Sequence, residues 1–253
     1  MRTFAITSAL LLASAFGQAA PRTWHFTCDY YNLDAKGHLE RRQRYSANYT
    51  RGLPGDGVRW SDVTVADGKG WADDFGPPQK QSFMEGFSYP YADAGNMMKP
   101  DFFHGFPPMA MQQRNFVWDT HMMEGFVDKL GELKPGLPYH VPNAAEVDLA
   151  GAGTFRNRDL QLTLTGTTKR NGQECAVIDY RALFNTIDAK TPAFTLLGRS
   201  DYWGQIWVSL ATKQIEYATL YEEVQGELTL PSQEKPMDIS VVRVGVFEPS
   251  SVQ

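Results

Sequence analysis

The chain contains few groups whose type and spacing could do acid–base chemistry. His104 and His121 are possible general bases, and Asp119, Glu124 and Asp128 lie on or beside a predicted helix. General acid–base catalysis needs such groups in a cleft with a tuned pKa. Glu124 and Asp128 are four residues apart and share a polar helix face, where carboxylates are more often solvated than paired. The pattern therefore favours a solvated helix face over a catalytic site.

No familiar catalytic or cofactor motif is present in the sequence, and we expect no cofactor. A Cu(I) site is the metal alternative, because thioether and imidazole ligands suit that ion. Methionines near His104 and His121 would supply the sulfur: Met97, Met98, Met109, Met111, Met122 and Met123. However, they form no regular repeat, and methionine is also the usual filler of irregular apolar gaps. We therefore predict no metal site.

Two tryptophans mark the best-defined hairpin of the chain, residues 202–221. A turn centred on Thr212 and Lys213 predicts a half-buried antiparallel pair with Gly204 opposite Tyr221. One face then carries Trp203 and Trp207 beside residues that include Ala218 and Leu220, so it is not purely a water face. We expect a helix and a loop rich in Phe and Met to cover these tryptophans. The predicted ligand-binding residues are Trp203, Trp207, Phe102, Phe106, Met109, Met122, Met123 and Phe126.

The order of elements predicts a mainly β fold. Alternating segments at about 24–31, 38–49, 58–66, 160–165, 174–183, 202–230 and 239–248 are separated by turn residues. They indicate an antiparallel meander that forms a curved sheet or half-barrel. One amphipathic helix is predicted over Asp119–Leu130, with Asp119 or Thr120 as its N-cap. Residues 73–118 show no sustained period and predict a long loop, either a lid or an excursion that packs on its own aromatics.

Such a sheet can enclose a cavity, and ligand pockets are mostly apolar with few polar groups. Small barrels are also commonly packed by their own side chains. A filled or partly filled interior is the favoured interpretation.

The composition excludes one class of partner. The chain of 253 residues has a formal net charge of −5 with 21% charged residues. A nucleic-acid binder would need a concentrated basic face, so we expect no nucleic-acid partner. The one basic run, residues 41–44, lies on a predicted strand and is interpreted as a solvated, charge-protected edge strand.

The N-terminus predicts export. A basic start, a short apolar run and small residues before a cut after Ala19 are typical of a secretory signal peptide at residues 1–19. The apolar run is too short to span a membrane. We therefore expect a periplasmic or secreted protein, not membrane-spanning, with a single β-rich domain over residues 20–253.

Cys28 and Cys175 are the only cysteines of the chain. In an exported protein, a single disulfide between them is the favoured interpretation, with two buried free thiols as the alternative.

The residues around the hairpin also support two resemblances. The pattern from Tyr202 to Val208, followed by a turn and the residues from Gln214 to Tyr217, resembles the strand pair of periplasmic LolA/LppX-like half-barrels. That resemblance implies an exported antiparallel sheet whose concave side is plugged by helices and binds lipid or acyl chains. A wider stretch, from NGQECAVIDY to the end of the hairpin, is similar to uncharacterised secreted bacterial β-rich proteins.

These observations favour an exported, non-enzymatic protein that binds an apolar, lipid-like ligand or an envelope partner protein. The binding face would be the sheet face covered by the helix and the loop. A secreted hydrolase of envelope or extracellular polymer is the alternative, and it would need a polar cleft with two carboxylates. A structural or assembly role is a third hypothesis and would need an exposed apolar patch.

Overall fold

A computed structural model describes residues 20–72, 74–142, 146–233 and 235–250. Its framework is one antiparallel sheet of 13 strands. The main path through the sheet runs β4-β3-β2-β1-β13-β12-β11-β10-β8-β7, while β5 pairs with β3 and β9 pairs with both β10 and β6. The last strand, β13, therefore lies between β1 and β12, so the first and last strands of the chain pair in the middle of the sheet.

The strands have the following bounds: β1 (Arg22–Leu33), β2 (Leu39–Leu53), β3 (Gly57–Gly68), β4 (Gln79–Lys80), β5 (Ser88–Pro90), β6 (Tyr139–His140), β7 (Glu146–Asp148), β8 (Gly153–Arg156), β9 (Asp159–Arg170), β10 (Gln173–Lys190), β11 (Thr195–Ser209), β12 (Ile215–Thr229) and β13 (Met237–Pro249). The long strands overlap the segments predicted from alternation, but β10 continues to Lys190 and β11 already begins at Thr195. The predicted signal peptide, residues 1–19, lies outside the described residues.

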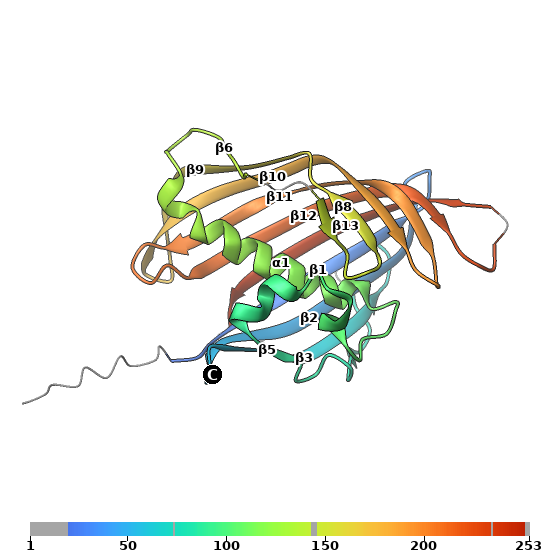
Figure 1. Cartoon of the computed structure of the whole chain (residues 1–253), viewed down its shortest axis with the longest axis horizontal. Coiled ribbons are helices and arrows are strands. Elements are labelled where there is room, and N and C mark those ends of the chain that lie inside the picture. Colours follow the sequence, from blue (N-terminus) through green and yellow to red (C-terminus); the bar gives the residue numbers. More distant parts are fainter. Residues whose placement is uncertain (1–19, 73, 143–145, 234, 251–253) are drawn as a thin grey trace, which may run out of the picture.

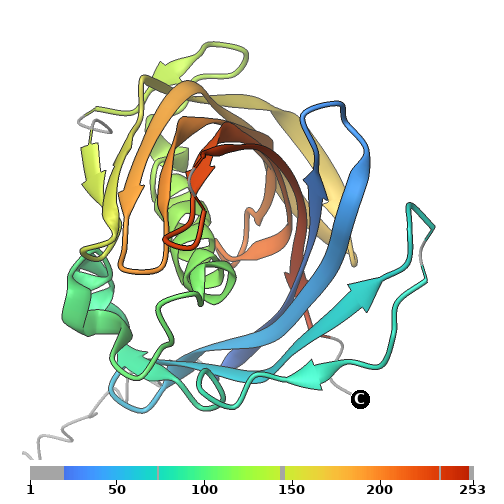
Figure 2. The same ribbon diagram turned by 90° about the vertical axis from the view of Figure 1, so that its right-hand side faces the viewer.

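The sheet curls around one α-helix, α1 (Met111–Asp128), which lies on its concave side (Figures 1 and 2). Alternation along each strand turns one set of side chains toward this helix and the other set outward. At one end of the concave side the inward residues form a solid aromatic core, in which Phe116 of α1 contacts Phe26 and Trp60. The predicted fold class, a curved antiparallel meander with one helix and an aromatic-rich loop region, is confirmed.

The Phe/Met-rich region packs largely on its own aromatic rings. It contains two short 3-10 helices, η1 (Tyr91–Asn96) and η2 (Pro100–Phe103), before α1 begins. Phe87 lies within 6.1 Å, centroid to centroid, of Phe103, and 5.0 Å from Phe106. The first contact is stacked and the second is edge-to-face, and aromatic pairs of both kinds stabilise beyond simple area burial. The region is therefore an ordered wall beside the helix.

The predicted start of the helix is wrong. The helix begins at Met111, eight positions before Asp119, and Asp119 lies in its middle with its side chain buried. The first turns contain Gln112, Gln113 and Arg114, whose polarity hides the apolar face of the helix. The helix starts earlier than predicted because polar side chains in its first turns make tertiary contacts. A search for hydrophobic periodicity does not detect such contacts.

The predicted register of the hairpin is also wrong, by one residue. Trp203 pairs with Tyr221 and Trp207 with Tyr217, and the register shifts between Trp207 and Val208. A slip of one residue moves every side chain of a strand to the other face. Trp203 therefore stacks on Tyr221 on the outer face, and 42% of it is exposed.

The consequence is that α1 covers the other face of the hairpin. Tyr202, Ile206 and Val208 are buried inward, with Ala218 and Leu220 beside them on β12. The expectation that the helix and the loop cover Trp203 and Trp207 is wrong for this geometric reason.

Gly204 belongs to the inward face and is needed there. A Cβ at this position would lie 2.0 Å from the Thr219 carbonyl oxygen and 2.7 Å from the Tyr180 hydroxyl oxygen. The Tyr180 hydroxyl donates to the Thr219 carbonyl across the glycine at 2.8 Å. The aromatic cover of this glycine is thus Tyr180 of the neighbouring strand, and Tyr221, which was predicted to lie opposite Gly204, pairs with Trp203.

Cys28 and Cys175 are free, buried thiols, so the predicted disulfide is wrong. Cys28 lies on β1 and Cys175 on β10, with β13, β12 and β11 between them. Neighbouring strands are about 4.8 Å apart, and a disulfide needs Cα atoms within about 7 Å. Burial raises the pKa of Cys28 to about 12, which keeps this thiol protonated and unreactive.

The basic run is not an edge strand, because β2 lies between β1 and β3. Arg42 is buried and, together with Arg44, binds the buried carboxylate of Asp29 on β1, at 2.8 Å and 2.7 Å. The neighbouring arginines hold the pKa of Asp29 below its ordinary value against the opposing effect of burial. The run is therefore part of a cross-strand ion cluster.

Candidate ligand cavity

The space between α1 and the sheet is only partly filled. Beyond the aromatic core lies a cavity of about 450 Å³. Its walls come from α1, from the loop that precedes it, and from every long strand between β1 and β10 along the sheet path. The apolar lining residues are Met97, Met98, Met111, Trp118, Met122, Val147, Leu149, Phe155, Leu160, Ile187, Ala189, Phe194, Leu196, Leu220, Val224, Ile239 and Val241.

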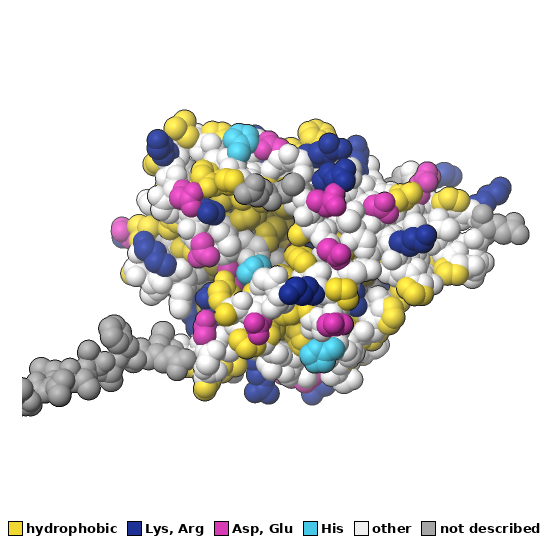
Figure 3. Space-filling view, viewed as in Figure 1, with side chains coloured by type: hydrophobic (Ala, Val, Ile, Leu, Met, Phe, Trp, Pro, Cys, Tyr) yellow, Lys and Arg dark blue, Asp and Glu magenta, His cyan; other side chains and the backbone are white. Residues whose placement is uncertain are grey.

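The alternation of side chains along the strands explains which residues line the cavity. Ile239, Val241 and Arg243 alternate along β13, so all three turn toward the helix, as do Leu220, Glu222 and Val224 on β12. Ile239, Val241 and Val224 are half-buried although they face inward, because nothing of the described chain fills the space in front of them. Figure 3 shows a hollow in this face of the molecule, with hydrophobic side chains gathered in it.

A buried charge cluster lies in the wall of this mostly apolar cavity. Arg243 of β13 donates to Asp119 of α1 and to Glu222 of β12. Glu222 also accepts a hydrogen bond of 2.6 Å from the Ser200 hydroxyl. The ring of Tyr30 lies 5.2 Å from the guanidinium carbon of Arg243 and closes the cluster on the β1 side. The cluster ties the helix to two central strands.

Burial controls the protonation of the cluster. It raises the pKa of Asp119 to about 6, against the opposing pull of Arg243. The two carboxylates raise the pKa of Arg243 well above its ordinary value despite burial, so the guanidinium stays charged. His121, also at the cavity, has its pKa lowered by burial, and its Nδ1 is buried without a partner among the described residues. At neutral pH Asp119 is therefore a carboxylate that faces a charged guanidinium.

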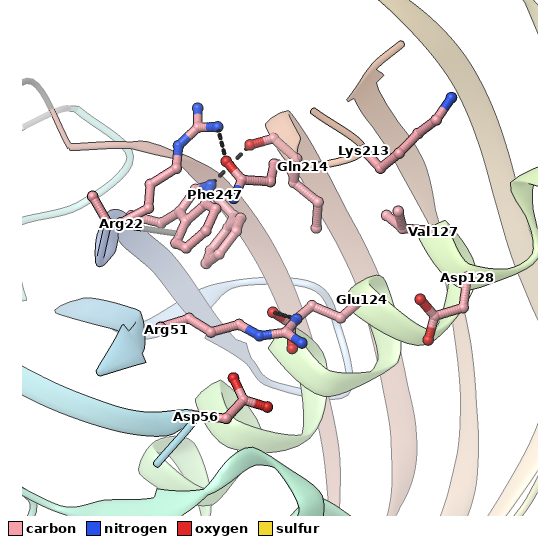
Figure 4. Close-up of a pocket in the computed structure, with 13 residues that line it drawn as sticks. Arg22, Arg51, Asp56, Glu124, Val127, Asp128, Lys213, Gln214 and Phe247 are labelled. Atoms are coloured by element: carbon pink, nitrogen blue, oxygen red, sulfur yellow. Dashed lines mark hydrogen bonds and ion pairs between the residues drawn. The ribbon is translucent and has the colours of Figure 1, made fainter. Parts of the chain in front are cut away.

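A second cavity, of about 330 Å³, lies near the other end of α1 and is lined by both charged and apolar side chains (Figure 4). In Figure 4, Arg51 reaches Glu124 while Arg22 reaches Gln214, at 3.0 Å and 2.5 Å. Glu124 is buried and accepts from the Tyr49 hydroxyl as well. The expectation that Glu124 belongs to a solvated helix face is therefore wrong. Arg51 and Glu124 are already paired with each other, and the space is smaller than the apolar cavity, which is therefore the stronger candidate site.

The structure does not bring the predicted ligand-binding residues together. Of the eight, Met122 lines the apolar cavity. Met123, Phe126 and Phe106 are buried in the solid core, and Phe102 packs in the aromatic cluster of the loop. Met109 is 59% exposed, and Trp203 and Trp207 lie on the outer face. Ligand binding by these residues stays a prediction, whereas the cavity places the candidate site elsewhere.

Sequence reasoning missed Arg243 and Glu222, although a signal was present. Each occupies an inward position of an alternating strand: Arg243 follows Ile239 and Val241 at intervals of two, and Glu222 lies between Leu220 and Val224. A charge in an inward series is rare unless it is paired. Two such charges of opposite sign on neighbouring strands were the sign of a buried pair.

Two further observations concern metal binding and membrane-spanning helices. Over residues 20–250, less the few positions that are not described, no three His, Cys, Asp or Glu side chains cluster in a way that could hold a metal ion. The described helices include none that is long and apolar enough to cross a membrane.

Comparison with known proteins gives structural likenesses only. No protein-family model matches the chain, and no curated protein sequence matches it. A structure of lipovitellin concerned with lipid–protein interactions is similar at a TM-score of 0.40 with 10% identity. The alignment covers 92% of this chain but spans only 25% of the lipovitellin chain.

A DUF1329 family protein from Desulfovibrio piger is similar at a TM-score of 0.18 with 8% identity, over 93% of this chain and 88% of that one. Likenesses this distant carry no functional argument. The resemblance to LolA/LppX-like half-barrels stays a prediction.

Proposed function

We propose that this chain is a non-enzymatic binding protein that holds an apolar, lipid-like molecule in the cavity between α1 and the sheet. The observation that carries this proposal is a mostly apolar space of about 450 Å³ between α1 and the sheet, beside a core of buried aromatic and aliphatic side chains. Protein interiors contain few voids larger than a water molecule. Ligand pockets, by contrast, are typically about 300–1,000 Å³ and mostly apolar with a few polar groups.

The size of the cavity indicates the size of the occupant. A water molecule has a share of about 30 Å³ in the liquid, and a methylene group is of similar size. A space of about 450 Å³ then accommodates about fifteen non-hydrogen atoms, the size of one medium-length alkyl chain. Walls of Met, Leu, Ile and Val suit such a chain, because methionine adapts its shape to irregular apolar surfaces.

The alternative hydrolase stays a prediction with weaker support. The carboxylates at the apolar cavity, Asp119 and Glu222, are both bound to Arg243 and so are engaged before any substrate arrives. A partner protein as the occupant is also less favoured, because the apolar surface lies inside the curve of the sheet.

Export is part of the proposal and rests on the N-terminal sequence. Residues 1–19 read as a signal peptide, which would place residues 20–253 in the periplasm or outside the cell. The intact mass of the protein recovered from that compartment should correspond to a chain that starts at Ala20. A mass that includes residues 1–19 would contradict export by cleavage.

The cavity is tested by filling it with protein. Leu196→Trp places a large ring in the cavity, whereas Leu197→Trp changes the adjacent outward residue, which is 51% exposed. We expect Leu196→Trp to weaken binding of an apolar fluorescent probe at least about tenfold, which is a change of about 1.4 kcal/mol. The Leu197→Trp control should bind as the unmodified chain does. Equal affinity of both variants, or no binding of the probe by the unmodified chain, would refute the proposal.

A further inference from the structure

We propose that the polar end of the bound molecule donates hydrogen bonds and carries no negative charge, as a long-chain amine or alcohol does. This inference rests on the proposed function and adds the chemistry of the head group. It is carried by the Arg243 cluster, which is the charged part of a mostly apolar wall that also includes neutral polar side chains such as Asn32, Asn115 and Asn157.

The first argument is the balance of charge. The charged residues that line the cavity are Asp119, Glu222 and Arg243, so two carboxylates face one guanidinium and the sum is negative. His121, Tyr30 and Tyr202 are the other titratable groups in the lining, and each is neutral at neutral pH. An uncompensated buried charge is costly. A cationic or hydrogen-bond-donating head group would offset that cost, and an anionic one would increase it.

The second argument concerns which atoms are free to bind. Both terminal nitrogens of Arg243 are taken, Nη1 by Glu222 and Nη2 by Asp119. A fatty-acid carboxylate or a phosphate would therefore meet an arginine that is already neutralised. Glu222 uses both oxygens, one for Arg243 and one for the Ser200 hydroxyl. The guanidinium is thus engaged at both terminal nitrogens, while its Nε is buried without a partner among the described residues.

One acceptor remains unused. Asp119 binds Arg243 through Oδ2, and no described residue donates to its other oxygen, Oδ1, although the residue is 92% buried and lies at the cavity wall. Oδ1 is not fully buried, since the Asp119 side chain is 11% exposed at the cavity wall, so a hydroxyl or ammonium donor in the cavity can reach it. A hydrogen bond to an ionised carboxylate is stronger than one between neutral groups. The geometry therefore assigns Asp119 Oδ1 as the head-group acceptor.

The experiment compares three probes of equal chain length by calorimetry: dodecylamine, dodecanol and dodecanoate. We expect dodecylamine and dodecanol each to bind at least about tenfold more tightly than dodecanoate. Asp119→Asn removes one negative charge from the cluster and should reduce the preference for dodecylamine over dodecanoate by about tenfold or more. Glu222→Gln removes the other negative charge of the cluster and provides the same test if the Asp119→Asn variant does not fold.

A matched control removes a buried acid elsewhere. Asp29→Asn neutralises a buried carboxylate that binds Arg42 and Arg44 away from the cavity, and it should leave the order of the three probes unchanged. Dodecanoate binding as tightly as the other two would overturn the head-group inference while leaving the cavity proposal intact. Binding of none of the three probes would refute the proposed function itself, and the inference with it.

Discussion

Replacing Arg243 by methionine should destabilise the fold more than any single change at the surface. The side chain of Arg243 is 6% exposed and those of Asp119 and Glu222 are 11% and 10% exposed, so all three charges are out of water. Removing the guanidinium leaves two like charges buried without a counter-ion. Breaking a buried ion pair from one side costs about 3–5 kcal/mol.

The same physical argument predicts a rescue. In the triple variant Arg243→Met, Asp119→Asn, Glu222→Gln, no charge of the cluster remains to be buried. Replacing a complete buried ion cluster is often neutral or stabilising. We therefore expect the triple variant to recover most of the free energy of unfolding that the single variant loses.

The assay is urea unfolding at neutral pH, followed by tryptophan fluorescence, with the denaturant slope compared among variants. Arg156→Met is the matched control, because its ion pair with Glu146 is about half exposed on both sides and should contribute no more than about 1 kcal/mol. A loss below about 1 kcal/mol for Arg243→Met, or a triple variant as unstable as the single one, would refute the account of the cluster.

Three further predictions concern the interior of the fold. Gly204→Ala should lower the free energy of unfolding by at least about 2 kcal/mol, since its Cβ would overlap the Thr219 carbonyl; an unchanged urea midpoint would contradict that close approach. Because burial raises the folded-state pKa of Asp119 from 3.8 to about 6, its carboxyl contributes stability below about pH 4 that is lost as the pH rises to about 6. Asp119→Asn should remove this loss, and parallel stability–pH curves of the two proteins between pH 4 and 6 would count against it. Finally, Cys28 and Cys175 should both react with a thiol reagent after unfolding without reductant, and a disulfide-bonded mass would contradict the free thiols.

The sheet could be predicted because alternation is a local signal. Turn residues such as Asn171-Gly172 and Asp34–Gly37 separate segments of period two, and the long strands are found there. The register of the β11–β12 hairpin could not, because the irregular turn after Ser209, in which Lys213 has a φ of 60°, shifts the pairing by one residue. That single residue decided which face of the hairpin meets the helix.

The site was less accessible to sequence reasoning than the fold. The sequence analysis placed the binding site at the tryptophans because large apolar residues dominate binding surfaces. In the structure, Trp203 stacks on Tyr221 on the outer face of the sheet. The charges that mark the cavity come from α1, β12 and β13, and Asp119 and Arg243 are 124 residues apart. Their pairing depends on strand order, in which β13 returns to lie between β1 and β12. No local period contains that information.

The most direct test of the central claim is methyl NMR of methionine-labelled protein titrated with dodecanol. Met98, Met111 and Met122 line the cavity, whereas Met109 is exposed on the surface and Met84 is buried in the solid core. We predict saturable shifts of the first three methyl signals with little change at Met84 and Met109. Unchanged signals from Met98, Met111 and Met122 at saturating dodecanol, or shifts confined to Met109, would contradict a ligand cavity between the helix and the sheet.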